Sequence, residues 1–518
     1  MNKTFTLLAF FVSILFNSNG QITFQTTIDL GGSDNACDIK LTADGGYIIS
    51  GMEFNLTTSA VQIFLLKLDA NGNSQWSKFY SGGVANGANL YQNYRLLVTE
   101  QDEYVVVGAY GSSSSTTDVL VMKTDAQGNL IWSNTYGGQG SDDGNSIFED
   151  ADGNYIIGGS FLLNSQRRMG YLKIAPNGNL LQQHFYADGL ACPFFEAVPL
   201  DSGRIGIVHS YSSLLNVVDT SGNLLSNFPG VFSNGYSVDA TQEPNGFAVL
   251  GLKAGAIGGV FAYVELNAAG TAVTHALSYA LGSDDLGPRN LVRLSNGDHL
   301  LYGLTTSMSG PSALLAIRFD TNYNIVFANK YAMGPSAHHE ACRALATPDG
   351  GWVFLGQHDR TGQYSDYDVY VVKTDAAGQS GCNQQAITLT TATPATVNLA
   401  PTSVYTASLT NGGTSVTPTV SIPSVITPLV PCIATAVSDL DRGKSIAFPN
   451  PVKDMLWVNG PENEYSWTLT NLCGKLIKSG RGSGAIKVDF SDVAPAVYTL
   501  QIIDGNSGAT DYRIVRIQ

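Results

Sequence analysis

A unit of about fifty residues recurs along most of this chain, and its clearest copy runs from Asp118 to Gly159. In that copy, four short runs of β-branched and aromatic residues are separated by turns rich in Gly, Asp and Asn. Branched and aromatic side chains fit a pleated sheet, whereas Gly, Asp and Asn fit tight turns. Each unit therefore predicts four short antiparallel strands.

Two series of turns mark the copies of this unit. The first comprises Asp44-Gly45, Gln101-Asp102, Asp152-Gly153, Ser202-Gly203, Asn245-Gly246, Asn296-Gly297 and Asp349-Gly350. The second comprises Asp69–Gly72, Asp125–Gly128, Pro176–Gly178, Asp219–Gly222, Asn267–Gly270, Asp320–Asn322 and Asp375–Gly378. Both series give seven copies, which predicts an all-β chain with a seven-bladed β-propeller over residues 22–380.

The two ends of the repeat region complement each other. The last copy lacks its outer strand after Gly378, whereas Thr23–Asp29 is a spare strand ahead of the first copy. We expect the spare strand to complete the last blade, which closes the ring and removes its exposed edges. With this strand order, the tight turns lie on one face and the variable loops on the other.

The remaining segments differ in composition from the repeats. Residues 381–440 are rich in Thr, Ser and Pro, which favours either a semi-rigid linker or a small β module. Residues 445–518 hold several short alternating runs, which favour a small Ig-like β-sandwich. At the other end, Lys3 and the apolar run Phe5–Phe16 predict a signal peptide over residues 1–20, cleaved before Gln21.

Charge and hydropathy exclude several classes of partner. The formal net charge is -15, which argues against nucleic acid and anionic lipid. Beyond the signal, no apolar run is long enough for a transmembrane helix, so we expect no transmembrane segment.

Six cysteines in an exported chain permit disulfide bonds. Cys382 and Cys432 flank one Thr/Pro-rich segment and are the predicted pair. Cys37 and Cys342 occupy equivalent positions in the first and last repeats, so a closed ring makes them neighbours, either bonded or as buried free thiols.

The C-terminal residues resemble the sorting domain of proteins exported by the type IX secretion system of Bacteroidetes. The matching positions include Pro449, Asn450, Pro451, Gly474, Tyr498, Arg513 and Arg516. In place of the family's Gly-x-Tyr, this chain has Ala496-Val497-Tyr498. The resemblance implies the type IX secretion machinery as partner and passage through the periplasm to the medium or the outer-membrane surface. The repeats resemble those of secreted Bacteroidetes β-propeller proteins, which implies a fold and no activity.

No pattern in the chain singles out a catalytic residue, a metal site or a cofactor. Adjacent strand residues point to opposite faces, so His338-His339-Glu340 favours a solvated loop over a metal site. Asp142-Asp143 and Asp284-Asp285 could bind Ca²⁺ through carboxylates and carbonyls, but no loop has an EF-hand pattern and capping of acidic loops is the favoured interpretation. Trp76 and Trp132 are predicted to be core residues.

The variable-loop face is the predicted contact surface, because loops of variable length on a rigid scaffold are typical of binding surfaces. Its most polar and aromatic loop holds His358, Asp359, Arg360, Tyr364 and Tyr367. We therefore expect a non-enzymatic protein that binds an unknown glycan or protein ligand.

Two other functions remain open at this point. One is a polysaccharide-active enzyme whose acids lie at the channel mouth, drawn from Asp34, Asp142, Asp143, Asp284, Asp285, Glu340 and Asp359. The other is a structural spacer in a surface layer.

Overall fold

The chain forms two compact units, one over Gln21–Ile433 and one that includes Ala434–Gln518. The computed structural model describes residues 21–55, 61–84, 94–111, 116–138, 140–187, 195–209, 215–228, 235–254, 259–268, 272–306, 312–333, 338–360, 366–392, 403–405, 411–415, 419–421, 427–434, 446–448, 455–459, 465–471, 476–493, 497–504 and 508–515. The predicted signal peptide lies outside these residues. The described residues are all-β except for one 3-10 turn at Asp201–Gly203.

A search for membrane-spanning helices among the described residues finds none of sufficient length and hydropathy.

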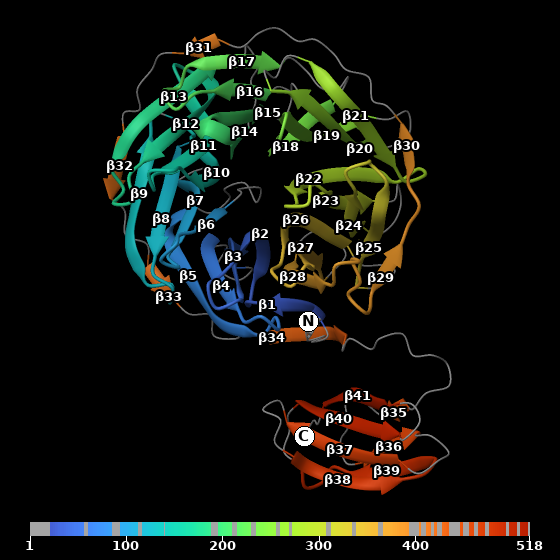
Figure 1. The fold of residues 1–518 in the computed structure, drawn as a ribbon. Coiled ribbons are helices and arrows are strands. Elements are labelled where there is room, and N and C mark those ends of the chain that lie inside the picture. Colours follow the sequence, from blue (N-terminus) through green and yellow to red (C-terminus); the bar gives the residue numbers. More distant parts are fainter. Residues whose placement is uncertain are drawn as a thin grey trace, which may run out of the picture. The chain divides into compact units, whose positions relative to one another are not determined.

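The first unit consists of antiparallel four-stranded sheets placed around a common centre, a propeller-like arrangement (Figure 1). The first two sheets are β2 (Ser33–Leu41), β3 (Tyr47–Phe54), β4 (Val61–Leu68) and β5 (Ser74–Val84), then β6 (Arg95–Val98), β7 (Tyr104–Gly111), β8 (Thr117–Thr124) and β9 (Leu130–Gly137). A parallel contact of Val84 with Gly111 joins these two sheets.

The next three sheets repeat the pattern. They are β10 (Asp143–Glu149), β11 (Tyr155–Leu163), β12 (Gln166–Ile174) and β13 (Leu180–Ala187); β14 (Phe195–Pro199), β15 (Ile205–His209), β16 (Leu215–Val218) and β17 (Leu224–Phe228); and β18 (Gly235–Glu243), β19 (Gly246–Ala254), β20 (Gly259–Asn267) and β21 (Val273–Ala280).

The last two sheets complete the circle. One holds β22 (Asp285–Arg293), β23 (His299–Thr306), β24 (Ser312–Phe319) and β25 (Ile325–Tyr331), and the other holds β26 (His338–Ala346), β27 (Trp352–Asp359) and β28 (Tyr367–Thr374). The fourth strand of this closing sheet is β1 (Thr23–Asp29), which pairs with β28 from Phe24↔Lys373 to Ile28↔Val369. The predicted closure by the spare N-terminal strand is thereby confirmed.

Apolar side chains fill the space between neighbouring sheets. One cluster joins Ile28 and Val369 of the closing sheet to Ile39 and Ile49 of the following sheet. Because both faces of a sheet are covered in this way, its middle strands are buried along most of their length, as in β7 and β8, whereas outer strands such as β21 are not. Trp76 and Trp132, predicted to be core residues, are partly buried and pack against these clusters.

Buried tyrosines at the ends of four outer strands link their sheets to the next. The Tyr136 hydroxyl donates to the carbonyl oxygen of Gly178 at 2.5 Å, in the second turn of the following sheet. The equivalent bonds join Tyr80 to Gly128, Tyr186 to Gly222 and Tyr331 to Gly378. These glycines have φ between +72° and +88°, a region that favours glycine. The tyrosine and the turn glycine that recur in the repeat thus form one hydrogen bond between neighbouring sheets.

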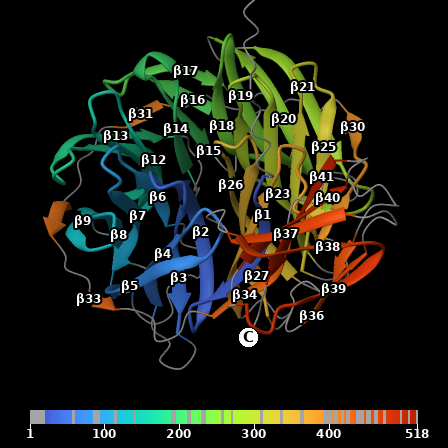
Figure 2. The ribbon, with the colours of Figure 1, turned by 60° about the horizontal axis from the view of Figure 1, so that its bottom comes forward.

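The Thr/Ser/Pro-rich segment, left open above between a linker and a small β module, contributes edge strands to the propeller sheets. We call residues 384–434 the strap. Its strands pair with outer strands in reverse order round the ring, and the last of them pairs with β1 of the closing sheet. The pairs are β29 (Gln384–Ala386) with β25, β30 (Thr390–Ala392) with β21, β31 (Ser403–Tyr405) with β13, β32 (Asn411–Ser415) with β9, β33 (Thr419–Ser421) with β5 and β34 (Thr427–Ala434) with β1. Figures 1 and 2 show these orange strands at the periphery.

The second unit contains two small sheets. One has the order β35 (Ile446–Phe448), β36 (Met455–Asn459) and β39 (Ala485–Asp489). The other has the order β38 (Leu476–Gly482), β37 (Tyr465–Asn471), β40 (Val497–Asp504) and β41 (Gly508–Val515). Leu456, Val488 and Leu500 from both sheets share one buried cluster.

Candidate functional site

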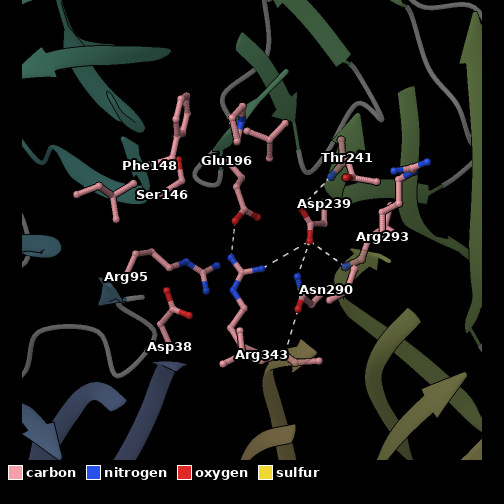
Figure 3. Close-up of a pocket in the computed structure, with 18 of the residues that line it drawn as sticks. Asp38, Arg95, Ser146, Phe148, Glu196, Asp239, Thr241, Asn290, Arg293 and Arg343 are labelled. Carbon is pink, nitrogen blue, oxygen red and sulfur yellow. Dashed lines mark hydrogen bonds and ion pairs between the residues drawn. The ribbon is translucent and has the colours of Figure 1, made fainter. Parts of the chain in front are cut away.

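A ring of polar side chains surrounds the centre of the propeller-like unit (Figure 3). The first strand of each sheet supplies one member: Asp38, Arg95, Ser146, Glu196, Asp239, Asn290 and Arg343. Each pairs with the fourth residue of the apolar run that follows the first turn, as Asp38 does with Ser50 and Arg343 with Leu355. They therefore occupy one equivalent position in the repeat, which we call the channel ring.

A β-bulge precedes many of the ring positions. The pairing register shifts at Cys37, Asn145, Val238, Arg289 and Cys342, each one residue before its ring member. A bulge re-aims the side chain that follows it, so the same irregularity is repeated to position the ring.

Several ring side chains bond to the backbone of the next sheet. Asp38 Oδ2 accepts from Leu96 N at 3.0 Å, and Ser146 Oγ accepts from Ala197 N at 2.8 Å. Asp239 Oδ2 accepts from Leu291 N at 2.9 Å, and Asn290 Oδ1 accepts from Ala344 N at 3.1 Å. In each pair the donor is the residue after the next ring member, so these side chains hold neighbouring inner strands together.

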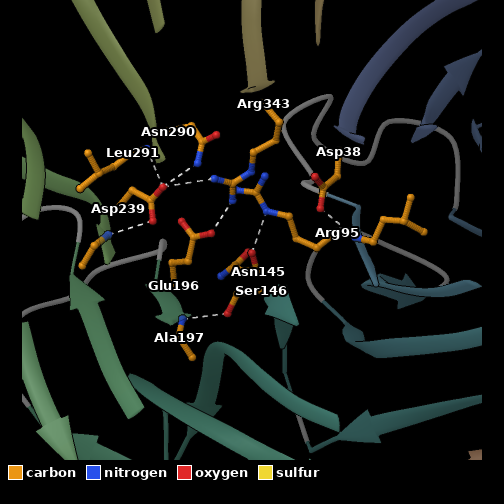
Figure 4. A network of polar contacts seen from close by, with 12 residues as sticks. Asp38, Arg95, Asn145, Ser146, Glu196, Ala197, Asp239, Asn290, Leu291 and Arg343 are labelled. Atoms are coloured by element: carbon orange, nitrogen blue, oxygen red, sulfur yellow. Dashed lines mark hydrogen bonds and ion pairs between the residues drawn. The ribbon is translucent and has the colours of Figure 1, made fainter. Parts of the chain in front are cut away.

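Arg343 crosses the channel and neutralises two acids of the ring (Figure 4). Its guanidinium pairs with Glu196 and lies 3.7 Å from Asp239 Oδ2 through Nη1. Asn290 Nδ2 donates to the same Asp239 oxygen at 2.7 Å. On the other side of the channel, Arg95 Nε donates to the Asn145 carbonyl oxygen at 2.9 Å.

The charges of the ring shift one another's pKa values. Burial raises the pKa of Asp239 to about 6, Glu196 raises it too, and Arg343 opposes the rise. Burial alone would raise the pKa of Asp38, but Lys40, Arg343 and Arg95 hold it below its ordinary value. Loss of solvation, and then the charge of Arg343, lower the pKa of Arg95.

The ring borders a cavity of about 350 Å³. Lys40, Phe148, Thr241 and Arg293 extend its lining toward the carboxyl ends of the inner strands, where the tight turns begin. Its lining carries four cationic side chains, Lys40, Arg95, Arg293 and Arg343, against three acidic ones, Asp38, Glu196 and Asp239. A pocket with a slight cationic excess is thus set inside a chain of net charge -15.

The acids of this pocket are occupied by structural bonds. Asp239 accepts from Ala240 N at 2.8 Å as well as from Leu291 N and Asn290, and Asp38 accepts from Ile39 N at 2.9 Å. A carboxylate that already accepts several donors is poorly placed to act as a nucleophile or a proton carrier. This arrangement favours binding over catalysis.

The predicted contact loop is only partly within the described residues. Arg360 pairs with Asp29, Asp366 and Asp368, and the backbone N–H of Tyr367 donates to Ser33 Oγ at 3.1 Å. Asp359 is buried, and burial lowers the pKa of the partly buried His358. Tyr364 lies outside the described residues. The structure brings Arg360 and Tyr367 to the β1/β2 junction, and none of the described residues of this loop lines the central pocket.

The other sequence candidates fall into separate places. His339 is buried and its Nε2 accepts from Met333 N at 3.1 Å, so it serves the fold there. Asp142 accepts two backbone N–H groups and Asp143 pairs with Arg167. Asp284 pairs with Lys330, and Asp285 accepts from Gly259 N. Each of these four acids therefore already has a partner in the protein.

The cysteines follow the expectations in part. Cys37 and Cys342 are free thiols, and Cys342 Sγ donates to Ala36 O at 2.9 Å across the ring closure. Cys382 is disulfide-bonded, and its carbonyl accepts from Gln25 of β1, the strand that β34 also joins. The side chain of Cys432, which β34 carries, lies outside the described residues, so the Cys382–Cys432 bond stays a prediction.

Comparison with known proteins identifies the C-terminal region. Residues 446–516 match the family model described as the secretion system C-terminal sorting domain. That span contains every predicted sorting residue, of which Tyr498 is buried in the second unit. Outside the described residues lie Pro449, Asn450, Pro451, Gly474 and Arg516, together with the side chain of Arg513. The chain is thus exported, to the medium or to the cell surface.

Solved structures resemble the chain at low sequence identity. No curated protein matches the chain. Among solved structures, a protein of unknown function from Bacteroides caccae is 12% identical, over 60% of this chain and 93% of its own, with a TM-score of 0.38. The WD40 domain of Neurospora crassa Pan2 is 11% identical, over 66% of this chain and 89% of its own, with a TM-score of 0.42. The polysaccharide lyase Uly1 is 8% identical, over 66% and 90%, also with a TM-score of 0.42. At these scores none of them assigns an activity.

Proposed function

We propose that this chain is a non-enzymatic binding protein, exported by the type IX system of a Bacteroidetes bacterium and displayed at the cell surface or released. The proposal includes a seven-bladed propeller over residues 22–380 and an Ig-like sorting domain over residues 445–518. The ligand is a glycan that carries a carboxylate, one acidic group of which enters the central pocket.

One observation carries this proposal, namely the cationic excess of the channel pocket. Lys40, which pairs with Asp38 at 3.4 Å, and Arg293, which pairs with Glu243 at 3.0 Å, line it with partly exposed side chains, and Arg95 contributes a third cation. Arginine and lysine at the wall of a partly desolvated cavity recognise carboxylates through charge-assisted hydrogen bonds. The bonds that occupy Asp38 and Asp239 explain why the bound sugar would be left intact.

A glycan array tests the proposal, with uronate-containing and neutral oligosaccharides presented to the full chain. We expect the wild type to bind the acidic set and Lys40→Gln to bind it at least about tenfold more weakly, the effect of losing one charge-assisted contact. Lys78→Gln is the matched control, because Lys78 lies on β5 and bonds Asn129 outside the pocket.

A second variant separates the pocket from the variable-loop face. If Tyr367→Ala and not Lys40→Gln abolishes binding, the ligand contacts the predicted loop and the pocket assignment is wrong. Binding of neutral sugars alone would contradict the choice of an acidic ligand, and silence across the array would favour a protein ligand or a spacer.

A polysaccharide-active enzyme is the second candidate, and one observation favours it. Asp239, with its pKa raised by burial to about 6, stands beside Glu196 in the same cavity, and a carboxyl group whose pKa is raised toward neutrality can act as a general acid. Release of reducing ends or unsaturated products from a uronate polymer, abolished by Asp239→Asn, would establish this activity.

A further inference from the structure

Three aspartates meet where the ring of sheets closes. Asp29 is the last residue of β1, Asp34 is the second residue of β2, and Asp368 is the second residue of β28. One carboxylate oxygen from each lies within 4.8 Å of those from the other two. Since β1 and β28 belong to the closing sheet and β2 begins the following one, the cluster bridges the junction.

Asp34 has a buried carboxylate oxygen without a partner. The residue is fully buried, and its Oδ2 accepts from Leu30 N at 2.6 Å. Its Oδ1 has no hydrogen-bond partner in the part of the chain that the structure describes. A buried carboxylate oxygen without a donor is costly, and native proteins normally supply such an atom with a hydrogen bond or a cation.

The junction between the second and third sheets, where β9 leads into β10, provides an internal comparison. Asp142 occupies the place of Asp34 and likewise accepts from the N–H four residues earlier, that of Gly138, at 2.7 Å. Its other oxygen accepts from Leu162 N at 2.6 Å, so the main chain satisfies both oxygens. Where the closing junction has Asp29, this one has Gly137. Compared with this junction, the closing junction has an additional carboxylate, that of Asp29. Among the described residues it also lacks a backbone N–H donor to the second oxygen of its aspartate, Asp34.

The local charge balance at the closing junction is strongly negative. Glu53 lies opposite Asp34 in the register of β2 and β3, and its carboxylate is also buried. Among the described residues, Arg360 is the cation that contacts this site, and its guanidinium forms ion pairs with Asp29, Asp366 and Asp368.

The spacing of the three oxygens selects among hard cations. Calcium binds oxygen at 2.3–2.6 Å, so two of its ligands lie at most about 5.2 Å apart. Magnesium binds at 2.0–2.1 Å, which limits the separation to about 4.2 Å. Oxygens that all lie within 4.8 Å of one another stay inside the calcium limit, whereas this bound does not bring them inside the magnesium limit.

We propose that Asp29, Asp34 and Asp368 bind one calcium ion, which fastens the N-terminal strand β1 to the first inner strand β2. The ion would supply the missing partner of Asp34 Oδ1 and offset the excess of carboxylates. The site is separate from the channel pocket, and its test does not involve the glycan.

The experiment follows calcium binding and thermal unfolding of the full chain. In wild type we expect one calcium site by titration calorimetry, with a Kd of about 10⁻⁴ to 10⁻³ M, as in extracellular modules. The Tm in about 5 mM CaCl₂ should exceed the Tm in EDTA by about 2–5 °C, and MgCl₂ at the same concentration should give a smaller shift.

Three variants locate the site. Asp34→Asn should abolish the calcium-dependent shift and melt in EDTA at or above the wild-type temperature, because a buried charge has been removed. Should that variant fail to fold, Asp29→Asn, at a half-buried position, should weaken calcium binding at least tenfold. Asp142→Asn should retain the calcium response.

The proposal is overturned if wild type shows neither binding nor a Tm shift. It is equally overturned if Asp34→Asn and Asp29→Asn respond to calcium as wild type does, or if Asp142→Asn alone loses the response.

Discussion

Single buried hydroxyl groups have different energetic roles at equivalent points of the repeat. The Tyr136 hydroxyl donates to Gly178 O of the next sheet, whereas the buried Tyr279 hydroxyl has no partner among the described residues. A buried hydrogen bond contributes about 1 kcal/mol net, and a buried hydroxyl without a partner costs free energy instead. The same side chain therefore stabilises one junction and not the other.

We expect Tyr136→Phe to lower the free energy of unfolding by about 1 kcal/mol, because Gly178 O loses the shorter of its two hydrogen bonds and keeps that from Asn134 Nδ2 at 3.2 Å. Tyr279→Phe removes a hydroxyl from an equally buried ring and should leave stability unchanged or slightly higher. Urea unfolding of both variants beside wild type checks this. Equal losses in the two variants would show that the hydroxyl contributes through packing alone.

At the scale of elements, the strap pairs with the outer strands that would otherwise be edges. A strand at the edge of a sheet presents unpaired N–H and C=O groups, which favour pairing with other chains. The strap strands cover the edges of β25, β21, β13, β9 and β5, and β34 covers β1. Their shortness suits this role, because three to eight residues suffice to mask an edge.

Removal of the strap should expose these edges. A chain that ends at Ser380 is expected to form dimers or larger species by light scattering, at concentrations where a chain ending at Leu440 stays monomeric. The longer chain keeps the strap and lacks only the sorting domain, so it is the matched control. Identical masses for the two would mean that the strap does not protect the sheets.

At the scale of the whole molecule, two units divide the tasks. The family match over residues 446–516 lies wholly within the second unit, Ala434–Gln518, whereas the pocket, the strap and the calcium site lie in the first. The export signal and the proposed binding pocket thus lie in separate units of one chain.

Deletion of residues 446–518 should leave the protein in the periplasm of a strain with a type IX system. The converse fusion, a periplasmic reporter followed by these residues, should reach the medium or the surface. Cell fractionation and protease accessibility of intact cells measure both. Surface display of the deleted chain would show that another segment directs export.

The sequence allowed the strands, both turn series and the closure by Thr23–Asp29 to be predicted. The strands and turns follow from local residue preferences, and the closure follows from counting strands, since the last repeat lacks one and the N-terminus has one to spare. It did not lead to the channel ring. Asp38, Arg95 and Glu196 belong to different residue types, so the common property, polarity at one register position, appears only after the repeats are aligned strand by strand. A polar residue at this one position of every aligned repeat is the signal in the sequence that could have identified the channel ring.

The strap was equally hard to predict, for a different reason. Strands such as Gln384–Ala386 and Thr419–Ser421 are three residues long and have no room for the alternation that marks a strand. Their conformation depends on an edge supplied by residues up to several hundred positions earlier.

The order of the strap also fixes how the molecule would bear a mechanical load. If the C-terminal unit is fastened to a cell surface, tension enters the propeller-like unit at β34, whose partner is the N-terminal strand β1. The predicted Cys382–Cys432 bond would carry that tension directly from β34 to Cys382 and leave the strap strands between the two cysteines without load. The strap would then stay on the sheet edges while the force passes to the end of the closing sheet.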